Sequence, residues 1–326
     1  MRSFGKALGQ LLVVFFLLYA AALYLIPRDQ VDRQIKFDPN SLGADLNAYL
    51  AKSEQQFSNI TAGTQKRIVW AGAVGAKTPL ALIYLHGFSA TSEEIRPVPA
   101  DLARALGANI FFTRLTGHGR DGAALAAATA SDWVQDMAEA MAIGRRIGGR
   151  VVVIGTSTGG TLAALAASDP VLSQAMAGLV LISPNFGLKP LAGKILDLPA
   201  ARYWGPLVAG ATRSFTPQND RHRQFWTNTY PTVALFPMAA LVREARAQDY
   251  SQTKLPLLLL YSPQDQVVDP AQTLKILGPW AGPKQIEPRI MTAQDDPFSH
   301  VIAGDILSPN QTAATEALIL AWAKAL

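Results

Sequence analysis

Residues 151–160 join an apolar run to a glycine-rich turn, and this junction constrains the fold more than any other feature of the chain. The run VVVI at 151–154 leads directly into GTSTGG at 155–160, and an alanine-rich segment follows. A continuous β-branched run predicts a strand that is buried on both faces, and the alanine-rich segment predicts a helix. The glycines around Ser157 let strand and helix approach closely, so the pattern predicts a tight strand-to-helix turn with Ser157 at its tip.

Strand-like and helix-like segments alternate along the chain from about residue 66. The predicted strands are Arg67–Trp70, Leu80–Leu85, Asn109–Thr113, Val151–Ile154, Leu179–Ile182, Leu255–Tyr261 and Gln285–Met291. The predicted helices are Val98–Leu106, Ser131–Ile147, Gly160–Ala167, Ala271–Leu277 and Thr312–Leu326. This alternation predicts an α/β fold with a mostly parallel sheet and helices on both faces. Between Pro184 and Lys254 no clear strand is found, and this aromatic-rich stretch predicts a mostly helical insertion at about 185–253.

Composition excludes several classes of protein and site. The chain has 326 residues, of which 49% are hydrophobic and 16% charged. This composition excludes intrinsic disorder, and the length allows one large α/β domain or about two smaller ones. The absence of cysteine excludes disulfides, thiolate metal sites and a cysteine nucleophile. Four scattered histidines do not approach metal-ligand spacing, and there is no glycine-rich dinucleotide or phosphate fingerprint. We therefore expect neither a metal nor a cofactor.

The positive charge is concentrated around one apolar segment. Residues 1–36 hold five basic and two acidic residues, a net charge of +3 out of +5 for the whole chain. No run of Lys and Arg occurs elsewhere, so we expect no nucleic-acid partner. Residues 11–26 are sixteen consecutive apolar or aromatic residues, and with residues 7–10 they would span about 30 Å as a helix, the thickness of a bilayer core.

Two interpretations of this segment remain open. The small residues at 20–22 suit the cleavage site of a signal peptide, whereas the apolar residues at 23–26 suit an uncleaved anchor. We favour residues 1–36 as a membrane anchor, followed by a polar linker or helix at 37–65 and a folded domain at 66–326. We expect that domain to be exported, with secretion after signal cleavage as the alternative. The oligomeric state is left open.

A serine nucleophile needs a general base, and histidine is the usual one. The four histidines are His86 and His118, which follow predicted strands before Ser157, His222 in the aromatic insertion, and His300 in the loop after the last predicted strand. If the three residues follow the chain order nucleophile, acid, base, the base must come after Ser157, which excludes His86 and His118 and leaves His222 and His300. His222 has no strand end to hold it, so we predict His300 as the base.

The acid should follow a strand that lies between Ser157 and His300 in the sequence. Asp265 is placed four residues after the predicted strand that ends at Tyr261. Asp269 precedes a proline and is typical of a helix N-cap. We therefore predict Asp265 as the acid and Asp269 as structural, with Asp295 and Asp296 as alternative acids.

The oxyanion of an acyl-transfer intermediate needs two backbone donors. The amide of Thr158, next to the nucleophile, is one candidate. The loop after Leu80–Leu85 supplies the other, most simply the amide of Phe88.

The motifs together resemble those of the α/β-hydrolase superfamily, in particular the group of monoacylglycerol lipases, carboxylesterases and serine aminopeptidase-like proteins. The resemblance covers residues 66–326 and rests on HGF at 86–88, GHG at 117–119, GTSTG at 155–159 and DQVVDP at 265–270. It implies an eight-stranded sheet and a lid inserted after the strand that follows the nucleophile helix. It also implies Ser157 as nucleophile, Asp265 as acid, His300 as base, and Phe88 and Thr158 as oxyanion donors.

The leading hypothesis is a membrane-associated serine hydrolase that cleaves carboxylic esters, such as a carboxylesterase or a monoacylglycerol or lysophospholipid lipase. The expected substrate is a small apolar ester or a lipid. One alternative is a peptidase or amidase, which would need a carboxylate near the pocket; the candidates are Asp197, Asp220, Glu244 and Asp249. The other alternative is a catalytically silent binding protein.

Overall fold

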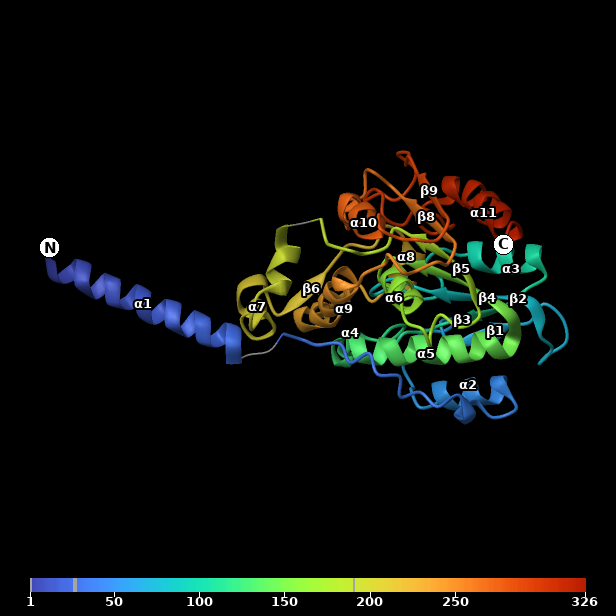
Figure 1. Cartoon of the computed structure of the whole chain (residues 1–326), viewed down its shortest axis with the longest axis horizontal. Helices are drawn as coiled ribbons and strands as arrows, with labels where there is room; N and C mark the ends of the chain where they lie inside the picture. Colours follow the sequence, from blue (N-terminus) through green and yellow to red (C-terminus); the bar gives the residue numbers. More distant parts are fainter. Residues whose placement is uncertain (1, 26–27, 190) are drawn as a thin grey trace.

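A seven-stranded sheet with helices on both faces forms the centre of the molecule, in a computed structural model that describes residues 2–25, 28–189 and 191–326 (Figure 1). The strands are β1 (Arg67–Val69), β2 (Thr78–Leu85), β3 (Asn109–Phe112), β4 (Gly148–Thr156), β5 (Met176–Ile182), β8 (Leu257–Tyr261) and β9 (Lys284–Pro288). Their order across the sheet is β1-β3-β2-β4-β5-β8-β9, with β1 antiparallel to β3 and all other pairs parallel. The bounds of each strand agree with those of a predicted strand to within three residues.

The central strands are buried on both faces, as their continuous apolar runs predict. Along β4, Val151 and Val153 belong to one hydrophobic core, whereas Val152 and Ile154 belong to the core on the opposite face. Because side chains alternate along a strand, a run without polar residues fills both cores at once.

Five helices pack on the two faces of this sheet. They are α3 (Val98–Leu106), α5 (Ala130–Ile147), α6 (Thr158–Ala167), α10 (Pro270–Leu277) and α11 (Pro309–Lys324). Buried residues of α3 and α11 belong to one core, and those of α5, α6 and α10 to the other. Their bounds agree with the predicted helices to within three residues, which confirms an α/β fold with a mostly parallel sheet.

The prediction of eight strands is wrong by one. The described residues ahead of β1 form a short 3-10 helix (Pro39–Leu42) and the helix α2 (Leu46–Glu54) instead of a strand. Asp45 caps α2 by accepting a hydrogen bond from the amide of Ala48. Leu46 and Leu50 then bury one side of α2 in the hydrophobic core, which gives this segment a helical periodicity of apolar residues.

The segment between β5 and β8 crosses the carboxyl-end side of the sheet and includes elements that the sequence did not indicate. It contains a 3-10 helix (Leu191–Asp197), α7 (Ala201–Ala209), α8 (Asp220–Phe225), a further 3-10 turn (Thr232–Ala234) and α9 (Leu235–Ala247). It also contains β6 (Thr212–Ser214) and β7 (Thr229–Pro231), which pair as a separate antiparallel ribbon. The segment therefore combines helices and 3-10 turns with a short two-stranded ribbon.

The N-terminal helix α1 (Arg2–Leu25) extends away from the rest of the molecule (Figure 1). Residues 28–38, the N-terminal arm, then run in an extended conformation along α5. There Gln135 Oε1 accepts hydrogen bonds from the amides of Lys36 and Phe37. The arm also contacts the insertion, because Asp29 pairs with Arg202 at the start of α7 at 2.6 Å. The helix α4 (Gly122–Ala127) lies beside β7 of the insertion.

Candidate active site

Ser157 occupies the turn between β4 and α6 in a strained backbone conformation. Its φ of 50° and ψ of −118° lie outside the regions that non-glycine residues ordinarily adopt. The two flanking glycines make the turn possible. A Cβ on Gly155 would lie 2.7 Å from the carbonyl oxygen of Gly159, and a Cβ on Gly159 would collide with the carbonyl oxygen of Leu85. The turn therefore presents the Ser157 side chain at the carboxyl end of the sheet.

Ser157, His300 and Asp265 form a continuous chain of hydrogen bonds. His300 Nε2 lies 3.0 Å from Ser157 Oγ, and His300 Nδ1 lies 2.8 Å from Asp265 Oδ2. All three residues are buried. Three residues that are far apart in the sequence are thus brought together from the ends of β4, β8 and β9, and they are the three selected from the sequence.

Backbone contacts fix the orientation of Asp265. Its Oδ1 accepts hydrogen bonds from the amides of Val267 at 2.8 Å and Val268 at 2.9 Å, which leaves Oδ2 for His300. Burial lowers the pKa of His300, but the charge and hydrogen bond of Asp265 raise it more, so this pKa lies above its ordinary value. His300 therefore gains a proton more readily than an ordinary buried imidazole.

The other three candidate acids have structural positions. Asp269 caps α10 by accepting a hydrogen bond from the amide of Ala271 at 3.0 Å. Asp296 Oδ2 accepts from the amides of His300 and Val301, so it holds the backbone of the histidine. Asp295 accepts hydrogen bonds from Thr292 in the same loop and from Gln311 in α11.

The remaining histidines lie away from Ser157 Oγ. The ring of His86 bonds to the carbonyl of Gly87 and accepts from the amide of Leu115, and burial lowers its pKa to about 4. The ring of His118 packs against that of His86 in a tilted arrangement, with centroids 4.9 Å apart. His222 contacts aromatic residues within the insertion. The histidines of HGF and GHG therefore belong to the core of their loops, and burial lowers the pKa of both, which favours the neutral state.

The amides of Phe88 and Thr158 are the two predicted oxyanion donors. Neither donates a hydrogen bond to any acceptor within the described part of the chain. Thr158 is the first residue of α6, so its amide belongs to the positive end of the helix dipole. The neighbouring amide of Gly87, in contrast, is already bonded to Glu94 Oε2 at 2.7 Å.

Glu94 is the residue of this site that the sequence did not reveal. It lies in the loop between β2 and α3, and its side chain is 2% exposed. Burial raises its pKa to about 7. The sequence shows Glu93 and Glu94 side by side in a polar loop, and nothing distinguishes them. In the structure, Glu93 pairs with Arg67 and Arg96, whereas Glu94 turns inward.

The insertion covers the loop that carries Phe88. The ring of Tyr230 meets that of Phe88 edge-on with centroids 5.5 Å apart, and the amide of Thr227 donates to the carbonyl of Ser89 at 2.7 Å. On the other side, Met238 of α9 lies 3.2 Å from the side-chain amide of Asn185, whose backbone amide donates to the carbonyl of Ser157. The insertion therefore packs against both the Phe88 loop and the segment that follows β5.

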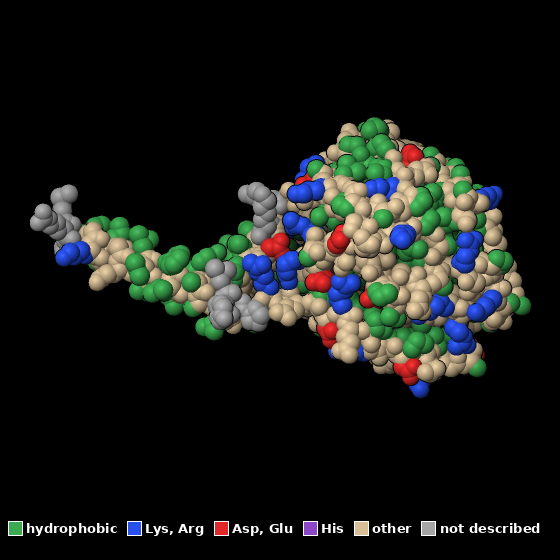
Figure 2. Space-filling model, viewed as in Figure 1, with side chains coloured by type: hydrophobic (Ala, Val, Ile, Leu, Met, Phe, Trp, Pro, Cys, Tyr) green, Lys and Arg blue, Asp and Glu red, His purple; other side chains and the backbone are tan. Residues whose placement is uncertain are grey.

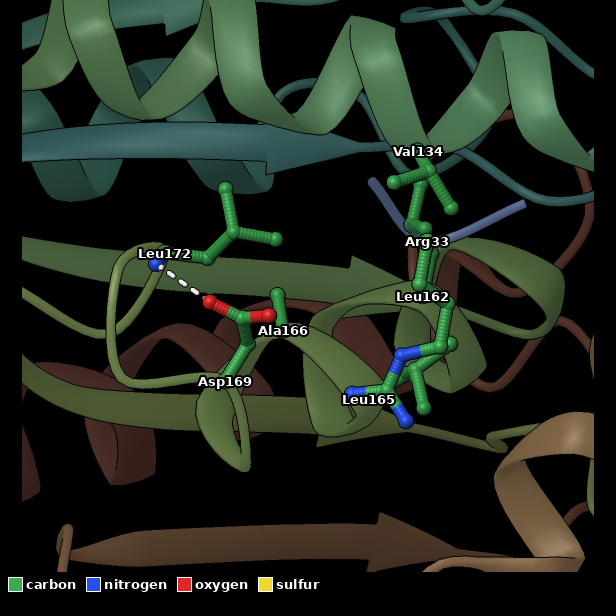
Figure 3. A pocket seen from close by; sticks show the side chains of 7 residues that line it. All are labelled: Arg33, Val134, Leu162, Leu165, Ala166, Asp169 and Leu172. Carbon is green, nitrogen blue, oxygen red and sulfur yellow. Dashed lines mark hydrogen bonds between the residues drawn. The ribbon is translucent and has the colours of Figure 1, made fainter. Parts of the chain in front are cut away.

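Two of the hollows in the described part of the molecule lie well apart from this site. One of about 10 Å³ lies between α5, α6 and the N-terminal arm and has room for no more than about one water molecule; Figure 3 shows its lining residues, which do not include Ser157. The other, of about 240 Å³, is lined by Trp70, Val74 and Arg146 among others, at the amino ends of the parallel strands. Within residues 2–25, 28–189 and 191–326, no group of three or more acidic or histidine side chains is placed to hold a metal ion.

Comparison with known proteins places the chain in a family. Residues 82–304 match the model of the alpha/beta hydrolase family. The thermostable monoacylglycerol lipase of Bacillus sp. (strain H-257) is 26% identical over 195 residues, which are 59% of this chain and 73% of that protein.

Solved structures share the fold at low sequence identity. A structure from work on the metagenome-derived lipolytic enzymes LipS and LipT has a TM-score of 0.64 at 22% identity, with 82% of this chain and 98% of that chain covered. The monoacylglycerol lipase of Paleococcus ferrophilus has a TM-score of 0.57 at 16% identity, with coverages of 79% and 98%.

These findings define a hydrolase similar to lipases and esterases. The chain belongs to the alpha/beta hydrolase family, since the family model spans more than half of it, and within that family it resembles the monoacylglycerol lipase and esterase group.

Proposed function

We propose that the protein is a serine hydrolase that cleaves carboxylic esters through an acyl-enzyme. The observation that carries this proposal is the hydrogen-bonded chain from Ser157 Oγ through His300 to Asp265, with distances of 3.0 and 2.8 Å. In this proposal Ser157 is the nucleophile, His300 the general base and Asp265 the group that fixes and stabilises the imidazole.

The reaction follows from these positions. Ser157 Oγ attacks the ester carbonyl as His300 Nε2 removes its proton, and the amides of Phe88 and Thr158 donate hydrogen bonds to the oxyanion. His300 then gives the proton to the departing alcohol, which leaves an acyl group on Ser157. A water molecule deprotonated by His300 attacks this acyl-enzyme, and the acid is released as Ser157 regains a proton.

An apolar substrate fits the surroundings of Ser157. The insertion acts in this proposal as a lid, because it places the aromatic ring of Tyr230 against Phe88, whose amide is a proposed oxyanion donor. Such side chains stabilise a bound hydrocarbon chain by removing it from water. The similarity to monoacylglycerol lipases supports a small lipid ester as the substrate.

The alternative of a peptidase or amidase needs a carboxylate free to bind a substrate amine. Of the four insertion candidates, Asp197 pairs with Arg243, Glu244 with Arg33, Asp249 accepts hydrogen bonds from Ser251, and Asp220 is fully exposed beside Arg223. Glu94 lies closer to Ser157, but it already accepts the amide of Gly87. This distribution of carboxylates favours an ester over an aminoacyl substrate.

We expect aryl esters of short and medium fatty acids to be cleaved faster than aminoacyl arylamides with the same leaving-group chromophore. The measurement is kcat/KM for both series, with ester acyl chains of increasing length and a monoacylglycerol. Faster cleavage of the arylamides would favour the peptidase. Cleavage of neither series would favour the binding protein.

We further propose that α1 anchors the enzyme in a membrane, with the catalytic domain exported. Residues 4–22 are mostly apolar, with a mean hydropathy of 1.8, and this segment is not buried against the rest of the molecule (Figure 2). A helix of 24 residues is about 36 Å long, enough to cross a bilayer core. Leu207 and Val208 of α7 are 86% and 74% exposed, and the pairing of Asp29 with Arg202 holds α7 near the end of α1.

Replacement of both Val14 and Leu18 with arginine is expected to release the enzyme from the membrane fraction. Each arginine near the middle of a spanning helix disfavours insertion by about 2.5–3.5 kcal/mol. The control changes the exposed Val74 and Ile290 to arginine, which leaves α1 intact. Membrane association is measured as resistance to alkaline extraction. Recovery of the unmodified protein in the soluble fraction, with a mass that lacks residues 1–22, would instead identify a cleaved signal peptide.

A further inference from the structure

Glu94 lies at the centre of a buried network beside Ser157 that the proposed mechanism does not use. Its Oε2 accepts hydrogen bonds from the amide of Gly87 at 2.7 Å and from the hydroxyl of Tyr84 at 3.2 Å. The same hydroxyl lies 3.2 Å from Oγ1 of Thr156, the residue before Ser157. The network therefore joins the end of β2, which leads to Phe88, to the end of β4, which leads to Ser157.

The contacts around Gly87 leave no space for a side chain at this position. A Cβ placed on Gly87 would lie 2.7 Å from Glu94 Oε1 and 3.1 Å from the Cβ of Ser157. Gly87 is thus packed between the carboxyl group of Glu94 and the proposed nucleophile. Because Glu94 takes the amide of Gly87, the next amide along the chain, that of Phe88, is the one left without an acceptor among the described residues.

The charges that face Glu94 come from three elements. Tyr84 approaches from β2. His300 faces it from the loop ahead of α11, and His300 is itself bonded to Asp265 through its ring and to Asp296 through its backbone amide. Glu93, its neighbour in the loop, is neutralised by arginines. Among the described residues Glu94 has no ion-pair partner, so a negative charge on it acts mainly on His300, whose pKa it raises.

We propose that Glu94 is a positioning residue that holds the loop of the oxyanion hole and, when ionised, makes His300 more basic. The proposal rests on the proposed esterase function. It assigns two separable properties to one side chain: an acceptor that fixes Gly87, and a charge that acts on the imidazole. Glutamine keeps the acceptor and removes the charge, whereas alanine removes both.

The experiment compares Glu94→Gln, Glu94→Ala and the neighbouring control Glu93→Gln by kcat, KM and the pH dependence of kcat/KM on a short-chain aryl ester. For Glu94→Gln we expect the acidic limb of the pH profile of kcat/KM to move to lower pH, because His300 loses a negative neighbour. We expect kcat on the plateau to stay within about threefold of the wild type, which corresponds to about 0.65 kcal/mol. For Glu94→Ala we expect kcat to fall by on the order of 100-fold with little change in KM, as for a displaced oxyanion donor. Glu93→Gln should match the wild type.

A second measurement separates this inference from the esterase proposal. Titration of the His300 ring by NMR in the wild type and in Glu94→Gln reports the pKa of His300 without any substrate. A lower pKa in the variant supports the inference even if esters prove to be the wrong substrates. Identical titrations, or a Glu94→Ala enzyme that loses thermal stability but keeps its kcat, would overturn it.

Discussion

Replacing Ser157 with alanine is expected to lower the rate of ester hydrolysis by on the order of 10⁴- to 10⁶-fold, as loss of the nucleophile does in other serine hydrolases. The hydroxyl is the only group on this side chain that could form the acyl-enzyme. It lies 3.0 Å from His300 Nε2, within the range for proton transfer. The fold should survive, because alanine removes one oxygen and retains the Cβ.

A fluorophosphonate probe provides the matching measurement for this variant. The probe should add its mass to the peptide that contains Ser157 in the wild type and should not label Ser157→Ala. Ser168→Ala, at the other end of α6, is the control and should be labelled and active. Full activity of Ser157→Ala would contradict the mechanism, and absence of labelling in folded wild-type protein would favour the binding protein.

Replacing Asp265 with asparagine is expected to lower kcat by on the order of 10⁴-fold while leaving the local structure in place. An asparagine Oδ1 can still accept the amides of Val267 and Val268, which directs its NH₂ group towards His300 Nδ1. An NH₂ group donates and cannot accept a proton, so His300 Nδ1 must become the acceptor. The ring then carries its proton on Nε2, which can no longer remove the proton of Ser157.

Asp269→Asn is the matched control for this change. Asparagine is as good an N-cap as aspartate, so α10 should remain capped and activity should be close to that of the wild type. A large loss of activity in Asp269→Asn with little loss in Asp265→Asn would reverse the roles assigned to the two residues. The pH dependence of kcat also shows whether the remaining activity still falls at low pH, as it does when a neutral imidazole acts as the base.

The parts of the fold that were predictable from the sequence are those in which local pattern and tertiary packing agree. The runs at 151–154 and 257–260 have no polar residue because both sheet faces are covered, and this pattern needs no long-range information. Ser157, Asp265 and His300 each follow a strand, and in a parallel sheet the carboxyl ends meet at one edge. Their side-chain distances required the structure.

The features that were missed depend on choices between similar residues or between similar local conformations. Glu93 and Glu94 have the same chemistry, and only the three-dimensional path of the loop decides which one turns inward. The expected eighth strand came from the resemblance to a family, whereas the apolar residues ahead of β1 follow a helical period. The ribbon formed by β6 and β7 has only three residues in each strand, too few for an alternating pattern.

The N-terminal arm has a consequence for how the molecule can be shortened. Its hydrogen bonds to Gln135 and Ser131 hold it against α5, and its ion pairs through Asp29 and Arg33 reach α7 and α9. A cut between α1 and residue 28 would leave these contacts whole, whereas a cut just before β1 would remove them and expose the faces of α5 and α9 that they cover. The boundary of the folded domain therefore lies next to α1, some forty residues ahead of the first strand.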